Sequence, residues 1–300
     1  MPCVCNDVEI RCGGNENIDL SNIFGKLSKL SAKSGKHFKF FYLNNTFITE
    51  LKENTFSDIT FGEITINDCS SLRSIHKNAF NTTDQVTTEI RIESNPKLSS
   101  PDNSIFDALS RFVHAHFVLL ADNNVSEIPS NAFHNEQDQL KVLLLIGKSI
   151  KKLGNNAFSL LKGLTSLTLE STSIDFIPEN AFEFNEVSNE SLTIERTHNK
   201  HLNITGFSMH SLTKLKRPTY ISIDIPNNSS FQYLDQKIFE PFLLSNDNNA
   251  IQIWTGSIDC NDCRNYWMKK NPTLLKRLIK INCSNHNPLN DTVNFKGCNI

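Results

Sequence analysis

The feature that most constrains this chain is a unit of 24 to 32 residues that recurs along most of its 300-residue length. Its clearest copy, residues 164–182, reads LTSLTLESTSIDFIPENAF and ends in Asn-Ala-Phe. Copies with this ending, or a weaker form of it, end at Phe56, Phe80, Phe106, Phe133, Phe158, Phe182, Phe207 and Phe239. Such a period predicts a solenoid, because one unit cannot bury its own apolar side and must stack on its neighbours.

Leu164, Leu167 and Leu169 form the pattern L-x-x-L-x-L, which at this period is typical of a leucine-rich repeat. The alternative, a doubly wound α/β sheet, needs a strand, a full helix and two loops in each unit, and the unit is too short for them. We therefore expect an α/β solenoid, a leucine-rich-repeat horseshoe with a parallel concave β-sheet and disulfide-stapled N- and C-terminal caps. The residues expected to point inward from nine strands are Phe41/Leu43, Ile64/Ile66, Ile90/Ile92, Val118/Leu120, Leu143/Leu145, Leu167/Leu169, Leu192/Ile194, Ile221/Ile223 and Ile251/Ile253.

Three residues beyond each pair, a leucine-rich repeat usually places an asparagine whose side chain hydrogen-bonds the backbone of neighbouring turns. Here these positions hold Thr46, Cys69, Asn95, Asn123, Lys148, Thr172 and Thr197. We expect Lys148 to extend outward, because a buried ammonium group without a partner is costly. The phenylalanine of each repeat is expected to stack as a spine on the convex side.

The ends of the chain differ from its middle and divide it into three predicted parts. Residues 1–37 read as an N-terminal cysteine cap, with a short edge strand around Val8 and Ile10 and a short helix or an irregular repeat at residues 19–30. Residues 38–250 hold about eight repeats, with loops or short helices expected at 224–250. Residues 251–300 hold the last strand and a C-terminal cysteine cap. In this cap the spacing of Leu274, Leu275, Leu278 and Ile279 predicts a helix.

Seven of the eight cysteines lie in the two predicted caps, which suggests disulfides formed in an oxidising compartment. The cysteines are Cys3, Cys5 and Cys12 at one end, Cys260, Cys263, Cys283 and Cys298 at the other, and Cys69 alone in between. The C-x-x-C at Cys260 and Cys263 is also compatible with zinc or redox chemistry, although zinc prefers a second close pair. Cys69 occupies an internal asparagine position, where we expect a buried, unpaired thiol.

Other features also favour an extracellular protein. Nine Asn-x-Ser/Thr sequences are candidate glycosylation sites: Asn44, Asn81, Asn124, Asn189, Asn203, Asn227, Asn228, Asn282 and Asn290. No apolar run approaches the length of a membrane span. Met1 is followed by Pro2 and Cys3 without a basic or apolar leader, so we expect that a signal peptide has been removed or is missing. The net charge of −2 gives no indication of nucleic-acid binding.

The Asn-Ala-Phe repeats, the opening C-V-C-x6-C and the closing C-x-x-C together resemble extracellular leucine-rich-repeat proteins: Toll-type ectodomains, Slit and small secreted arthropod proteins. Among these, the chain is similar to the arthropod group of the non-catalytic leucine-rich-repeat subunit of Oplophorus shrimp luciferase. The resemblance implies the pairs Cys3–Cys12, Cys260–Cys283 and Cys263–Cys298. The first cysteine of the family's N-terminal cap is absent here, which implies that Cys5 lacks an intrachain partner.

Sequence motifs for catalysis were sought and not found. The chain has no nucleophile elbow, phosphate-binding loop, H-E-x-x-H or dinucleotide fingerprint. His114 and His116 have the spacing of a metal-binding pair on a strand, but we favour a solvated pair, and we interpret His198 and His201 in the same way. An open, wet sheet cannot raise the pKa of a carboxyl group as an apolar cleft does. We therefore expect no catalytic residues, no metal and no cofactor.

Two neighbouring strands break the expected alternation of buried and polar residues. The outward positions of most strands are polar, as at Thr65, Arg91, Thr168, Thr193 and Ser222. Six outward positions are instead apolar: Phe117, Leu119, Ala121, Val142, Leu144 and Ile146. Acidic residues flank them on the same face, with Glu93 on one side and Glu170, Glu195 and Asp224 on the other. An apolar centre with a polar rim is typical of a binding surface.

These features leave two hypotheses about function. The first is a secreted binding module that holds a protein, or a glycan or lipid-like molecule, on its concave face. The second is a non-catalytic subunit of a secreted oxidase or luciferase-like complex, as the resemblance implies. Both need the same surface, and a loop, the N-terminal segment or a second copy of the chain is an alternative occupant of it.

Overall fold

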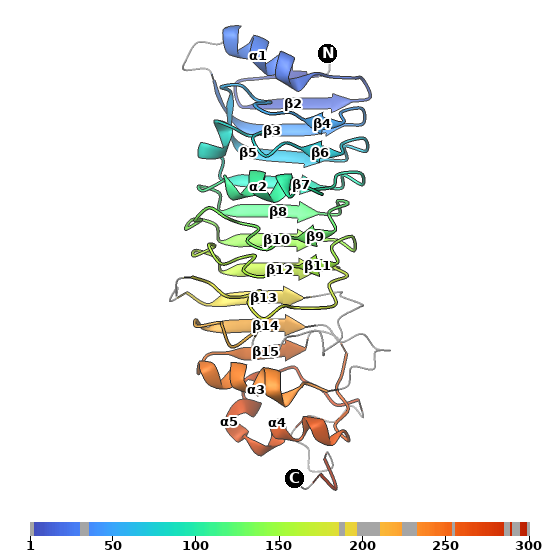
Figure 1. Cartoon of the computed structure of the whole chain (residues 1–300), viewed down its shortest axis with the longest axis vertical. Coiled ribbons are helices and arrows are strands. Elements are labelled where there is room, and N and C mark those ends of the chain that lie inside the picture. Colours follow the sequence, from blue (N-terminus) through green and yellow to red (C-terminus); the bar gives the residue numbers. More distant parts are fainter. Residues whose placement is uncertain are drawn as a thin grey trace.

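The computed structural model describes residues 3–30, 36–185, 190–196, 211–223, 233–253, 256–284, 289 and 295–298. In this part of the chain, twelve strands form one long main sheet in which strand order follows chain order (Figure 1). β1 is antiparallel to β2, and every later strand is parallel to its neighbours. The strands are β1 (Cys3–Cys5), β2 (Glu9–Gly14), β3 (His37–Asn45), β5 (Thr60–Asn67), β7 (Glu89–Glu93), β8 (Phe117–Ala121), β10 (Val142–Ile146), β12 (Ser166–Glu170), β13 (Leu192–Arg196), β14 (Thr219–Ile223), β15 (Ala250–Ile253) and β16 (Leu278–Ile279).

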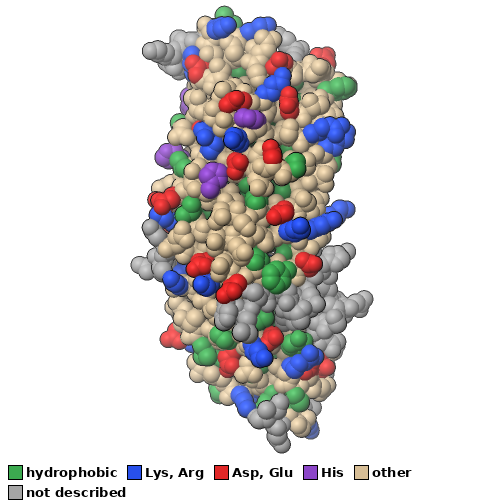
Figure 2. All heavy atoms as spheres, viewed as in Figure 1, with side chains coloured by type: hydrophobic (Ala, Val, Ile, Leu, Met, Phe, Trp, Pro, Cys, Tyr) green, Lys and Arg blue, Asp and Glu red, His purple; other side chains and the backbone are tan. Residues whose placement is uncertain are grey.

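The other elements form the back of the solenoid and its two ends. Two small parallel sheets pair β4 (Glu50–Leu51) with β6 (Ser74–Ile75), and β9 (Glu127–Ile128) with β11 (Lys152–Leu153). The helices are α1 (Leu20–Leu30), α2 (Ser104–Ser110), α3 (Gln236–Ser245), α4 (Trp267–Lys270) and α5 (Pro272–Leu275), with 3-10 turns at Thr83–Gln85 and Cys263–Asn265. Figure 2 shows the face that carries α2, on which acidic and basic side chains are interspersed and hydrophobic ones are scattered.

The predicted inward residues fill one continuous core between the main sheet and the back of the solenoid, and each of them is at most 2% exposed. The phenylalanine spine is also confirmed wherever the structure describes it, since its members are 0–1% exposed and neighbouring rings such as Phe56 and Phe80 lie 5.8 Å apart. Phe207 lies outside the described residues. Asn131 and Asn156, which precede Ala-Phe, have φ values of 55° and 54°. Asparagine tolerates this left-handed conformation, which accounts for it at these two copies; Asn78 and Asn180 precede Ala-Phe without a positive φ.

A ladder of buried polar side chains joins the first repeats behind the main sheet. The Cys69 backbone N–H donates to Asn95 Oδ1 at 2.9 Å, Asn95 Nδ2 donates to Asn123 Oδ1 at 3.0 Å, and Asn123 Nδ2 donates to the Ile92 carbonyl at 2.8 Å. The prediction of Thr46 is wrong, because Asn45 is fully buried and its Oδ1 accepts from the N–H of Ile48 at 2.8 Å. Lys148 is exposed as expected, and Thr172 is buried. Thr197 lies outside the described residues.

One predicted strand register is wrong by two residues. Leu167 pairs with Ile194, and Ile194 pairs in turn with Ile221, so β13 points Arg196 inward in addition to Leu192 and Ile194. Arg196 is 1% exposed, and its Nη2 donates to the Ile174 carbonyl at 3.2 Å. Burial lowers the pKa of Arg196 to about 10. A search for apolar pairs could not select an arginine, and the shift by two leaves every side chain of β13 on its predicted face.

Both caps close the ends of the core. The structure contains the disulfides Cys3–Cys12, Cys260–Cys283 and Cys263–Cys298, the same pairs that the resemblance implies. Cys5 is free and exposed, and Cys69 is free and buried. The predicted helix around residues 274–279 is only partly correct. Helix α5 ends at Leu275, and Leu278–Ile279 forms the short strand β16, which pairs with β15. The core is therefore closed at this end by a twelfth strand rather than by a longer helix.

Candidate partner-binding face

The open face of the main sheet is the face whose side chains point away from the core, which is the predicted concave face. Parallel pairing aligns these side chains in three rows that cross the strands. The middle row contains Thr65, Arg91, Leu119, Leu144, Thr168 and Glu195. One outer row contains Glu63, Glu89, Phe117, Val142, Ser166 and Thr193, and the other contains Asn67, Glu93, Ala121, Ile146 and Glu170.

The register brings together the six apolar side chains that the sequence singled out. Phe117, Leu119 and Ala121 of β8 lie directly opposite Val142, Leu144 and Ile146 of β10. We call these six residues the apolar patch. Leu119 and Ala121 are each only 7% exposed, less than expected for the open face. They are nevertheless separate from the hydrophobic core of the solenoid. The other four are half-buried, so the patch offers a shallow apolar surface.

Charged groups lie on both sides of the apolar patch. On β7, Arg91 Nε lies 2.5 Å from Glu89 Oε1, and the Arg91 guanidinium lies 4.2 Å from the centre of the Phe117 ring. Glu93 is half-buried in the outer row beside Ala121. On the other side, Glu170 is opposite Ile146, and Thr168 Oγ1 donates to Glu195 Oε2 at 3.4 Å. The predicted acidic neighbours therefore do flank the patch, except Asp224, which lies outside the described residues.

Sequence reasoning missed part of the open face. Glu63 and Glu89 extend the acidic side, and alternation around Ile64 and Ile90 could have identified them. Nearer the N-terminus, Tyr42 lies under the guanidinium of Arg11, which is 3.9 Å from the ring centre. The hydrogen bond from Arg11 lowers the pKa of Glu9. At this end of the face, Arg11 is therefore engaged with both Glu9 and Tyr42.

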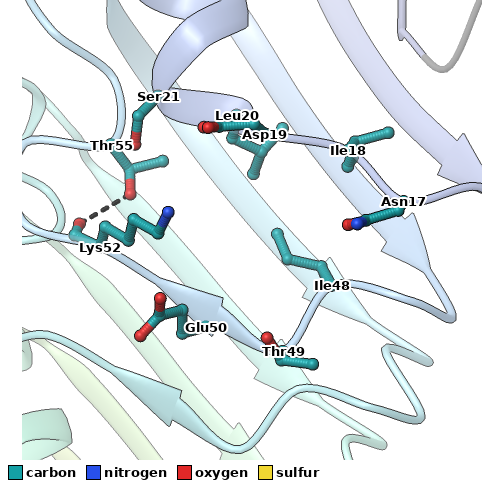
Figure 3. A pocket seen from close by; sticks show the side chains of 10 residues that line it. All are labelled: Asn17, Ile18, Asp19, Leu20, Ser21, Ile48, Thr49, Glu50, Lys52 and Thr55. Carbon is teal, nitrogen blue, oxygen red and sulfur yellow. Dashed lines mark hydrogen bonds between the residues drawn. The ribbon is translucent and has the colours of Figure 1, made fainter.

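A pocket between α1 and the segment that contains β4 is a second candidate site (Figure 3). It is lined by Asn17, Ile18, Asp19, Leu20, Ser21, Ile48, Thr49, Glu50, Lys52 and Thr55. Part of this lining serves the fold, since Asp19 Oδ1 accepts from the N–H of Asn22 at 3.1 Å and Thr55 Oγ1 donates to the Lys52 carbonyl at 2.7 Å. We assign no chemistry to this pocket, because its polar groups include no base positioned beside a nucleophile.

The described residues show neither a metal-binding cluster nor a membrane-spanning helix. No group of three or more His, Cys, Asp or Glu side chains in the described segments is arranged to hold a metal ion. His114 and His116 are both exposed just before β8, and His198 and His201 lie outside the described residues. None of the described helices has the length and apolar character needed to cross a membrane.

Four of the nine candidate glycosylation sites fall in described segments. Asn44, Asn124 and Asn282 are exposed. The Asn81 amide is held on both sides, since Nδ2 donates to Asn54 Oδ1 at 2.5 Å and Oδ1 accepts from Arg111 Nη2 at 2.8 Å. Asn189, Asn203, Asn227, Asn228 and Asn290 lie outside the described residues.

Comparison with known proteins supports the repeat assignment. A family model for the BspA type leucine rich repeat region matches in six copies, at residues 31–159 and 117–240. Among solved structures, the crystal structure of the mouse RP105/MD-1 complex is similar, with 12% sequence identity and a TM-score of 0.30, over 98% of this chain and 67% of that one. No curated protein sequence matches the chain.

Proposed function

We propose that this chain, which belongs to the family of BspA-type leucine-rich repeats, is a secreted, non-enzymatic protein that binds a protein partner on its open face. The observation that carries the proposal is the apolar patch. The strands on either side of the patch carry polar side chains at the equivalent positions, so the change to six apolar side chains is local. These are Glu89, Arg91 and Glu93 in β7 and Ser166, Thr168 and Glu170 in β12. Covering apolar surface in the middle of a polar face with a partner makes the free energy of binding more favourable.

Secretion is supported by the chemistry of the two caps. Three disulfides close the ends of the solenoid, and disulfides persist in oxidising compartments. In such a compartment, Asn44, Asn124 and Asn282 are accessible for glycosylation. Modification of Asn81 would disturb its hydrogen bonds to Asn54 and Arg111, so we expect this site to be used less.

The patch can be tested with a double substitution, Leu119→Thr with Leu144→Thr. Threonine already occupies this row at Thr65 and Thr168, so the strands should tolerate it while the apolar surface is lost. We expect the tagged wild-type protein to capture a specific partner from the fluid into which it is secreted, and the variant to lose that partner. The matched control is Leu30→Thr with Leu244→Thr, because these leucines are 85% and 59% exposed on α1 and α3. Unchanged capture by the patch variant would contradict the proposal.

A non-catalytic subunit of a secreted oxidase or luciferase-like complex is the second candidate function. The pairs Cys3–Cys12, Cys260–Cys283 and Cys263–Cys298 are those that the resemblance to extracellular leucine-rich-repeat proteins implies, and they are compatible with both candidates. The two candidates differ in the partner alone. A bound chain with oxidase activity that the isolated protein lacks would support the subunit, and a partner without enzymatic activity would support the simpler binding role.

A further inference from the structure

We infer that the segment that occupies the open face is a positively charged amphipathic polypeptide, with apolar residues at its centre and lysine or arginine on both sides. The inference rests on the proposed function, since it specifies the partner of the same apolar patch. It comes from the charges that surround the patch, which are almost all of one sign.

From β5 to β13 the three rows of the open face contain five glutamates and one arginine. The glutamates are Glu63, Glu89, Glu93, Glu170 and Glu195, and all five are half-buried. The arginine, Arg91, is paired with Glu89 and lies over Phe117, so its charge is matched within β7. The face around the patch is therefore strongly acidic, although the whole chain has a net charge of only −2. An acidic face attracts a cationic partner and repels an anionic one.

The register of β5 and β7 adds a second argument. Glu63 and Glu89 lie directly opposite each other in the same row. Like charges in this position destabilise a sheet, and the ion pair of Arg91 is with Glu89. A lysine or arginine from a partner, placed between these strands, would reduce the repulsion. The unbound protein thus retains an electrostatic cost that a cationic partner removes.

The spacing of the acidic strands sets the size of the segment. β7 and β12 carry Glu93 and Glu170 in the same outer row, with β8 and β10 between them. At about 4.8 Å per strand, the two acidic strands are about 14 Å apart. A helix rises 1.5 Å per residue, so about ten helical residues span this distance. A helix that crosses the strands can therefore place apolar residues on the patch and a basic residue over each acidic strand.

A second copy of the chain fits this face less well. In a two-fold dimer centred on the patch, each copy would present the same surface to the other. Depending on the direction of the two-fold axis, β7 of one copy would then lie over β12 or β7 of the other, and in both cases the acidic side chains of the two faces would meet. Their mutual repulsion would oppose the gain from burying the apolar patch.

The test uses two labelled synthetic helical peptides with the full-length protein, and measures binding by fluorescence anisotropy. Both peptides have the same leucine-rich centre, and the flanking residues are lysine in one and glutamate in the other. We expect only the lysine peptide to bind. Raising the salt concentration from about 0.1 M to about 1 M shortens the Debye length from about 10 Å to about 3 Å and should weaken its binding.

Protein variants separate the acidic rim from the patch. Glu93→Gln with Glu170→Gln should weaken binding of the lysine peptide by about three- to tenfold, as expected for two surface charge pairs. The matched control, Glu127→Gln with Glu179→Gln, removes the same charge from exposed positions away from the open face and should have no effect. Circular dichroism and thermal melting confirm that each variant is folded.

The outcomes distinguish this inference from the proposed function. Equal binding of the two peptides, or no effect of Glu93→Gln with Glu170→Gln, would overturn the inference while leaving the open face as a binding site. Peptide binding that Leu119→Thr with Leu144→Thr leaves unchanged would contradict both. If light scattering shows a wild-type dimer that the patch variant dissociates, the occupant is a second copy and the cationic segment is wrong.

Discussion

The two faces of β8 and β10 are made of similar residues but have different roles. In β10, Leu143 and Leu145 are 0% exposed in the core, whereas Leu144 between them faces outward and is half-buried. In β8, Val118 and Leu120 lie inward and Leu119 lies outward in the same way. Side-chain type alone therefore does not distinguish the core from the open face in these strands. The face on which a residue lies does, and the repeat register sets that face.

The largest expected effect comes from phenylalanines on the two sides of the sheet. Phe133→Ala and Phe158→Ala should each lower the free energy of unfolding by about 3–5 kcal/mol, because both rings are fully buried in the spine. Phe117→Ala removes a ring of the same size from the open face and should cost about 1 kcal/mol, mainly through its contact with Arg91. Chemical denaturation monitored by circular dichroism measures all three.

Phe295→Ala provides a further control for the spine. Phe295 is 4% exposed but packs in the C-terminal cap, where its ring centre lies 5.9 Å from that of Tyr266. We expect a smaller loss in the free energy of unfolding than at Phe133 or Phe158, because the cap lies at the end of the solenoid and packs against repeats on one side alone. Equal losses at all these sites would remove the distinction between the spine and the rest of the molecule.

The sharpest form of the comparison uses one substitution at two adjacent positions of β10. Leu145→Thr creates a cavity and buries a hydroxyl group, and it should cost about 2–5 kcal/mol. Leu144→Thr changes the open face and should cost less than about 1 kcal/mol, because Thr168 occupies the next position of the same row. Thermal melts of the two variants should therefore differ by several degrees. If Leu144→Thr is the more damaging, the assignment of the two faces is reversed.

Most of the fold could be predicted because the repeat encodes it many times. Period, strand positions and the phenylalanine spine each recur in several units, so an error in one unit does not change the prediction for the others. The exceptions are single events. Arg196 replaces an apolar residue in β13, Asn45 replaces Thr46 in the ladder, and Leu278 and Ile279 form a strand after a short helix. Only tertiary packing determines these, so no pattern in the sequence could reveal them.

The candidate site was predictable to a lesser degree. The six apolar residues could be identified because they interrupt the alternation in two neighbouring strands. The low exposure of Leu119 and Ala121 could not be predicted, since exposure depends on how side chains pack across the strands. The position of Glu63 directly across from Glu89 also depends on the strand register, which the sequence alone does not give.

Cys69 extends the comparison to ionisation inside the core. Burial raises the pKa of the Cys69 thiol to about 11, from an ordinary value of 9.0. Between pH 9.0 and about pH 11, the thiol is therefore protonated in the folded protein and ionised in the unfolded chain. The free energy of unfolding is unaffected by this thiol below pH 9, and it should fall by about 2–3 kcal/mol as the pH rises towards 11. Cys69→Asn, which copies Asn95 in the ladder, should remove this part of the loss in denaturation curves measured across that range. Tyrosine ionisation contributes equally to both proteins, and an unchanged curve would contradict the buried thiol.

The smallest effect concerns reactivity rather than stability. Cys5 is exposed on β1, at the free edge of the main sheet, whereas Cys69 is fully buried beneath the turn after β5. A thiol must be accessible to react, so a thiol-specific alkylating agent should label Cys5 in the native protein at neutral pH. Burial and the nearby Asp7 carboxylate raise the pKa of Cys5, so this labelling should accelerate as the pH increases. Cys69 should react only after denaturation, and Cys5→Ser should abolish native labelling. Peptide mapping by mass spectrometry gives both results, and a bond between Cys5 and Cys69 would show that the N-terminal cap and the ladder are arranged differently.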